Sequence, residues 1–147
     1  PTSNQKLACG GTMSYPAMKE AGVDVRLGTD GSASNNSLDL RAEAKAASLV
    51  QRHDHWDARV LGPEQTWDLA TKGSQDWVTW DLSDIRMRPF GRDGRRLLSN
   101  LIYSGANVMD VFVEGEAVRR DGRTLTLDED KVAGELEESV ADYYQDV

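Results

Sequence analysis

Apolar residues recur at helical spacing in four stretches of the chain. The first covers residues 13–21 and stops at Gly22, which suits a C-terminal cap. The same spacing predicts an amphipathic helix over residues 37–51 and a short helix that begins near Pro63. A last helix follows Asp128, which can cap it, and carries an apolar stripe formed by Val132, Leu136, Val140 and Tyr143 or Tyr144.

Alternation of apolar and polar positions predicts strands elsewhere. Val23, Val25 and Leu27 alternate with polar residues or glycine, so a short strand is expected up to Thr29. Helix, strand, loop and helix in this order are typical of parallel α/β folds. In such folds functional residues follow the carboxyl ends of strands, and Asp30 lies at that position.

The second half of the chain has a different pattern. Residues 77–82 (WVTWDL) and 108–113 (VMDVFV) are rich in β-forming residues. Two turn signals follow, Glu114 with Gly115 and Asp121 with Gly122, between further strand-like runs. This half is therefore expected to form a small β-meander.

Composition narrows the class of protein. The 147 residues suffice for one domain with a real core, and 39% hydrophobic with 29% charged residues is ordinary for a folded protein. No apolar run approaches the ~20 residues of a membrane span and no signal peptide is visible, so a cytoplasmic location is expected. A net charge of −8 argues against nucleic acid or an anionic membrane as partner, because both need a basic surface. The single cysteine, Cys9, excludes an internal disulfide and a thiolate zinc site.

The loop GTDGSASNNS around Asp30 has three interpretations. A phosphate cradle is disfavoured, because the loop lacks the lysine of the P-loop pattern and its aspartate would repel phosphate. As a turn, Asp and Gly after a strand and Ser or Asn before a helix are ordinary loop residues. As a metal or catalytic site, a carboxylate at a strand end can ligate a cation and accept a proton from its water, but it needs partners, usually histidines. The residues alone leave the last two interpretations open.

His53 and His55 are the histidines of the chain. One intervening residue is the spacing of paired metal ligands on a strand, where alternate side chains face the same way. These two follow directly on a predicted helix, where two positions turn the side chain by about 200° and the rings point apart. A solvated helix terminus, which favours a protonated histidine, is the preferred interpretation.

Two blocks of the chain resemble one family. PTSNQKLACGG, AGVDVRLGTDG and SNNSLDL, followed by an alanine-rich helix, resemble the late barrel of the amidohydrolase superfamily. The branch concerned contains the S-adenosylhomocysteine and methylthioadenosine deaminases and the triazine chlorohydrolases. The later stretch NLIYSGANVMDVFVEGEAVRRDGRTLTLDE is similar to the small β-domain and final helix of that family.

The resemblance implies an α/β fold, the C-terminal portion of a (β/α)8 TIM-type barrel. Residues 1–75 would form the end of the hydrolase barrel, 76–127 a segment of a small β-sandwich domain, and 128–147 the C-terminal helix. The chain opens on PTSN without methionine and shows one strand–helix unit, which favours a piece of a longer polypeptide. Between Thr71 and Asp76 the family normally inserts a longer helix and a loop, whereas four residues join the two here.

The resemblance also implies a site with one divalent metal, zinc first and iron second. Asp30 matches the family's aspartate that lies at the metal and moves a proton to the leaving group. Ser3 and Asn4 match one supporting loop of the substrate pocket, and Ser34, Asn35 and Asn36 match another. The family's HxH pair and its two further metal histidines belong to segments absent from this chain, and His53 and His55 do not stand in their place.

The function implied is that of a portion of a metal-dependent deaminase or chlorohydrolase. It would act on C–N or C–Cl bonds of a purine nucleoside or other N-heterocycle through a metal-bound hydroxide, and a homo-oligomer is expected. This segment alone is expected to be inactive, and the missing barrel is expected to expose apolar surface on the Val25 strand and cause self-association. The alternative is a catalytically inactive fragment that acts only as a binding or assembly module.

Overall fold

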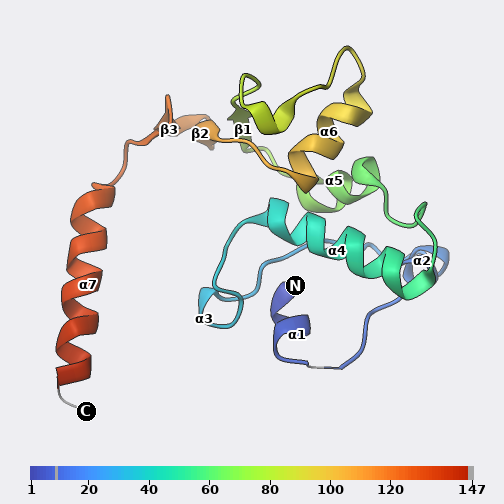
Figure 1. Cartoon of the computed structure of the whole chain (residues 1–147), viewed down its shortest axis with the longest axis horizontal. Helices are drawn as coiled ribbons and strands as arrows, with labels where there is room; N and C mark the ends of the chain where they lie inside the picture. The colour runs from blue at the N-terminus through green and yellow to red at the C-terminus, as the bar shows by residue number, and fades with distance from the viewer. Residues whose placement is uncertain (9, 146–147) are drawn as a thin grey trace. The chain divides into compact units, whose positions relative to one another are not determined.

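The chain forms two compact units in a computed structural model that describes residues 1–8 and 10–145 (Figure 1). Unit 1 comprises Pro1–Gly73 and Ser83–Ala106, and unit 2 comprises Ser74–Leu82 and Asn107–Val147. Cys9 lies outside the described residues, and of Ser3 and Gln145 the backbone alone is described. Residues 83–106, which sequence analysis assigned to the segment 76–127, fold with unit 1.

Unit 1 is helical in its described residues. Its helices are α1 (Thr2–Lys6), α2 (Tyr15–Glu20), α3 (Ser32–Asn35), α4 (Leu40–His55), α5 (Pro63–Thr71), the 3-10 helix η1 (Ile85–Met87) and α6 (Gly94–Tyr103). Helices α4, α5 and α6 pack against one another, and η1 packs on α6. The core of the unit is formed by the buried side chains of Ala44, Leu61, Met87, Leu101 and Ile102.

Helix α4 confirms the predicted amphipathic helix with shifted ends. It starts at Leu40 because the carboxylate of Asp39 accepts the backbone N–H groups of Arg41 and Ala42, at 2.8 and 3.3 Å. It ends at His55, where Trp56 takes a left-handed conformation with φ +50°. Helices α2 and α5 confirm the other two predictions in this half, and Gly22 has φ +73°, as expected of a cap.

The strand predicted up to Thr29 is wrong. Residues 23–30 contain no strand; the N–H of Val23 donates to Met18 of α2 and that of Leu27 to Leu69 of α5, at 3.0 and 3.1 Å. Neither bond belongs to a ladder with a second strand. Alternation marks a segment able to join a sheet, but a strand exists only when a neighbour pairs with it. Of the apolar residues in this segment, Val25 and Leu27 are half-buried and Val23 is 50% exposed, so part of the expected apolar surface is accessible.

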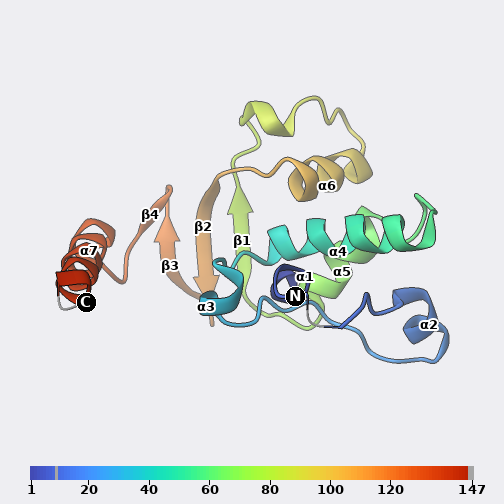
Figure 2. The same cartoon turned by 60° about the horizontal axis from the view of Figure 1, so that its bottom comes forward.

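Unit 2 contains a four-stranded antiparallel sheet in the order β1 (Trp77–Trp80), β2 (Val108–Val113), β3 (Glu116–Arg120) and β4 (Arg123–Thr124), shown in Figure 2. The predicted meander is confirmed, because both turn signals connect adjacent strands and all four of their residues have positive φ. Trp77 of β1 lies opposite Phe112 of β2, and their rings stack with centroids 3.7 Å apart.

Helix α7 (Glu129–Gln145) confirms the predicted final helix of unit 2. Its cap is Asp128, whose carboxylate accepts the N–H of Lys131 at 3.1 Å. The predicted apolar stripe is exposed, with Leu136 63% and Tyr144 72% accessible. No helix in the described part of the chain is both long enough and apolar enough to cross a bilayer.

Candidate functional site

Asp30 lies in the loop between residues 23–29 and α3. Its backbone is in the left-handed region, with φ +61°, and its side chain is exposed. The hydroxyl of Ser34 donates to Asp30 Oδ2 at 2.9 Å and also lies 3.0 Å from the carbonyl of Gly31. The hydroxyl therefore ties the carboxylate to the first turn of α3.

Asn35 connects this loop to helix α4. Its side chain is 8% exposed, and Nδ2 donates to the carbonyl of Thr29 and to Oε1 of Glu43, each at 2.7 Å. Asn36 follows with φ +66°, and its amide oxygen accepts a hydrogen bond from the ammonium of Lys6 in α1. Three of the predicted supporting residues, Ser34, Asn35 and Asn36, thus lie in the loop that follows Asp30 and form hydrogen bonds there.

Glu43 is a member of this cluster that sequence reasoning missed. Its side chain is 3% exposed, and Oε2 accepts the backbone N–H of Thr2 at 2.6 Å while Oε1 accepts the amide of Asn35. The feature of the sequence that could have identified Glu43 is its position as an acidic residue on the alanine-rich face of a predicted helix. An acidic residue in the first turn of a helix is equally expected for its favourable interaction with the helix dipole, so the signal was not decisive.

A cavity of about 240 Å³ lies beside the cluster in unit 1. Its walls include Asn4, Val25, Leu27, Glu43 and Gln51. Asn4, a predicted supporting residue, is therefore on the cavity wall but has no described side-chain bond to the Asp30 loop, whereas the side chain of Ser3 lies outside the described residues.

The two histidines lie in the last turn of α4, as predicted. His53 is exposed and its ring is 5.8 Å from that of Trp56. His55 is half-buried: Nδ1 is 2.9 Å from the carbonyl of Gln51 and Nε2 is 3.2 Å from Ser14 Oγ. Since a carbonyl can only accept, Nδ1 carries a proton, and both ring nitrogens of His55 are engaged in hydrogen bonds.

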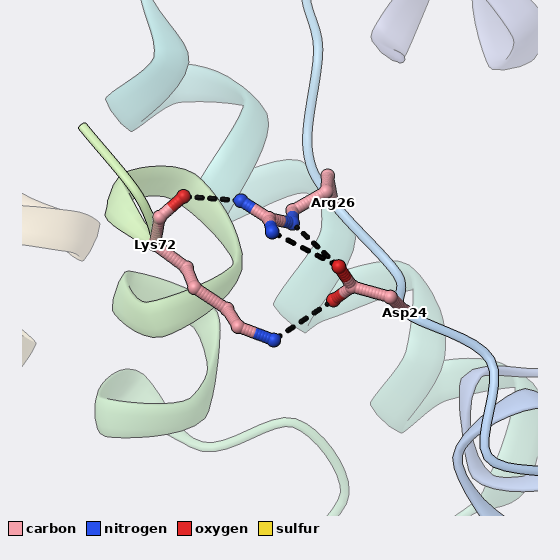
Figure 3. A network of polar contacts seen from close by, with 3 residues as sticks. All are labelled: Asp24, Arg26 and Lys72. Carbon is pink, nitrogen blue, oxygen red and sulfur yellow. Dashed lines mark hydrogen bonds and ion pairs between the residues drawn. The ribbon is translucent and has the colours of Figure 1, made fainter.

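Asp24, Arg26 and Lys72 form an exposed ionic network (Figure 3). The guanidinium of Arg26 lies 2.9 Å from Asp24 and also donates to the carbonyl of Lys72, while the Lys72 ammonium lies 3.0 Å from Asp24. These hydrogen bonds, first that of Arg26 and then that of Lys72, lower the pKa of Asp24 from 3.8 to about 2. The perturbed carboxyl is explained by its ion pairs and fastens residues 24–26 to the end of α5.

Comparison with known proteins identifies proteins that are similar to this chain in structure and in sequence. A crystal structure of an adenosine deaminase from Xanthomonas campestris with bound zinc matches 100% of this chain and 37% of its own, with TM-score 0.85 and 28% identity. The 5-methylthioadenosine/S-adenosylhomocysteine deaminase of Bacillus thuringiensis (strain Al Hakam) is 36% identical over 90% of this chain and 34% of that protein. The chain is therefore similar to deaminases of the amidohydrolase superfamily over most of its length.

The similarity to these proteins covers only part of their length. An amidohydrolase from an environmental sample of the Sargasso Sea shares the fold, with TM-score 0.68 and 24% identity over 99% of this chain and 36% of the other. No family model matches the chain. The chain spans about a third of the length of the curated relatives it matches.

The described residues do not form a complete metal site. Zinc in proteins takes three or four protein ligands. The Asp30 carboxylate is a suitable donor, yet the described residues contain no group of three His, Cys, Asp or Glu side chains that could hold a metal ion. Within the described ranges, Asp30 therefore remains a candidate donor without a complete ligand set around it.

Proposed function

We propose that the chain is the C-terminal part of a metal-dependent aminohydrolase, with residues of the last barrel units, a segment of the small β-domain and the final helix. The observation that carries the proposal is Asp30 in GTDG, fixed by Ser34 and Asn35, in a chain 36% identical to a 5-methylthioadenosine/S-adenosylhomocysteine deaminase. The substrate class is a purine nucleoside or related N-heterocycle, with cleavage of a C–N bond. Cleavage of a C–Cl bond is the variant reaction of the same site.

Asp30 has two proposed tasks in the complete protein. It binds the divalent metal, zinc first and iron second, and it accepts and passes on one proton at its carboxylate. Bound zinc supplies a water whose pKa lies near neutrality. The Ser34 hydroxyl supports both tasks, because its hydrogen bond orients Oδ2. Asn4, Asn35 and Asn36 with Ser3 support the pocket, and the complete protein is proposed to be cytoplasmic and homo-oligomeric.

The test uses a hybrid in which this chain replaces the matching segment of the Bacillus thuringiensis relative. The folded hybrid is expected to hold about one zinc per chain and to release ammonia from methylthioadenosine. Asp30→Ala is expected to lower kcat by about 10²–10⁴-fold, the range for loss of a proton-transfer group. Asp68→Ala, an exposed aspartate of α5, is the matched control and should leave kcat unchanged. Full activity in Asp30→Ala, or a folded hybrid without zinc, would contradict the proposal.

One observation favours the non-catalytic alternative, a binding or assembly module. The described part of the chain lacks a complete set of metal ligands. The same hybrid separates the two functions, since a module without catalysis predicts neither zinc nor ammonia release when the rest of the fold is supplied.

A further inference from the structure

Glu43 is a buried carboxylate whose two oxygens each accept one hydrogen bond. Burial of a charged group is costly unless its oxygens are paired, and here Thr2 and Asn35 provide the donors at 2.6 and 2.7 Å. Glu43 stands on α4, a helix of 16 residues, whereas both donors stand on short segments. The carboxylate therefore joins α1 and α3 to one rigid element.

The connection continues from Glu43 to Asp30. Asn35 uses Nδ2 twice, toward Glu43 and toward the carbonyl of Thr29, so both of its N–H groups are engaged. The Thr29 carbonyl belongs to the peptide unit that begins Asp30. A left-handed conformation in a residue other than glycine persists only when its surroundings hold it. The pair of Glu43 and Asn35 holds one end of this strained residue, and Ser34 holds its side chain.

We propose that Glu43 is the positioning residue for Asp30: through Asn35 it sets the place and the left-handed backbone of Asp30 relative to α4 and α1. The mechanical part of this inference stands on the contacts alone. Its meaning for catalysis rests on the proposed function, in which Asp30 must meet a metal held by residues of other segments.

The test is NMR spectroscopy of the 147-residue chain with Glu43→Gln. A glutamine can accept one of the two hydrogen bonds but turns its NH2 group toward the other donor, so one buried donor loses its acceptor. Hydrogen exchange at the backbone amides of residues 34–36 is expected to accelerate about tenfold or more, the effect of an unsatisfied buried group. The backbone coupling constant of Asp30 is expected to move away from its value at φ +61°.

Glu20→Gln is the matched control, because Glu20 is exposed on α2 and has no described side-chain partner. It should leave exchange and coupling constants unchanged. A Glu43→Gln chain that keeps the exchange rates of residues 34–36 and the coupling constant of Asp30 would overturn the proposal.

A second variant covers the case in which Glu43→Gln fails to fold. Asn35→Ala removes the connection but leaves Glu43 with Thr2. It is expected to shift the Asp30 signals while the amides of α5 and α6 keep their protection. Unchanged Asp30 signals in Asn35→Ala would overturn the proposal.

These NMR measurements need neither metal nor substrate, so they separate the inference from the proposed function. In the zinc-loaded hybrid, Glu43→Gln should lower kcat about tenfold or more with a smaller change in KM, as for a group whose effect appears in the transition state. An inactive, zinc-free hybrid refutes the proposed function alone. An active hybrid with unchanged Asp30 signals in Glu43→Gln refutes the positioning role alone.

Discussion

At the scale of single residues, the Asp24 carboxylate predicts a defined pH dependence. Arg26 and Lys72 lower its pKa from 3.8 to about 2, so the folded state holds the ionised form more strongly than the unfolded chain does. The resulting stabilisation is complete above pH 3.8 and is lost as the pH falls through about 2. Asp24→Asn should therefore lower the thermal midpoint of unit 1 slightly at neutral pH, and this effect should shrink near pH 2 and vanish well below it.

Asp68→Asn is the control for this experiment, because it removes an equal charge from an exposed residue of the same unit. Since all three groups of the network are exposed, added salt should reduce the effect of Asp24→Asn. An effect of Asp24→Asn that persists unchanged well below pH 2, where the carboxyl is protonated in both states, would contradict the ion-pair explanation.

At this scale, a sequence motif can indicate which residues lie together when the partners are close along the chain. Asp30, Ser34 and Asn35 lie within six positions, so a loop motif brings them together whatever the rest of the fold does. The bond from Thr2 to Glu43 spans 41 positions and depends on how α1 packs against α4. No local pattern carries that information, which is why Glu43 had to come from the structure.

At the scale of elements, helix α6 is expected to contribute most of its stability through Ile102. This side chain is fully buried, and Ile102→Ala leaves a cavity that should reduce the free energy of unfolding of unit 1 by about 2–5 kcal/mol. Ile85→Ala is a control of identical chemistry, because Ile85 is 82% exposed, and it should change stability by about 0.5 kcal/mol or less. Urea unfolding of both variants measures the difference; equal losses would show that α6 does not belong to the core.

The end of α6 also requires a glycine. Gly105 has φ +82°, and a Cβ at this position would lie 2.9 Å from Nη1 of Arg41, whose guanidinium bonds Asp39 at 2.8 Å. Gly22→Ala carries the backbone strain alone, about 1–2 kcal/mol, since nothing lies near its Cβ position. Gly105→Ala should cost about 0.5–1 kcal/mol more, because Arg41 must move and weaken its ion pair. Equal unfolding free energies for the two variants would show that Arg41 moves without cost.

The helices and strands that were predicted correctly share one property: the residues that indicate them lie within the element itself or directly beside it. Helix α4 has its cap at Asp39 and its own apolar spacing, and the hairpins of unit 2 have their turn residues. The segment 23–29 has strand alternation but no neighbour to pair with in this chain, so the prediction was wrong. Helix α6 was not predicted although Asp93 caps it and Leu97 and Leu101 repeat at helical spacing. It lies in sequence between the strands β1 and β2 but packs with unit 1.

At the scale of the whole chain, the question is whether a segment that spans about a third of the length of its relatives can bind a metal by itself. The chain contains Asp30 and its supporting loop, but its described residues contain no group of three side chains that could hold a metal ion. A cation held by one exposed carboxylate exchanges with water and gains none of the three-ligand geometry that catalytic zinc requires. The isolated 147-residue chain should therefore fail to remove zinc from a chromophoric chelator in a binding competition. Its release of ammonia from methylthioadenosine should equal that of buffer, and ammonia release that disappears in Asp30→Ala would show instead that these residues complete a site by themselves, for example between two copies.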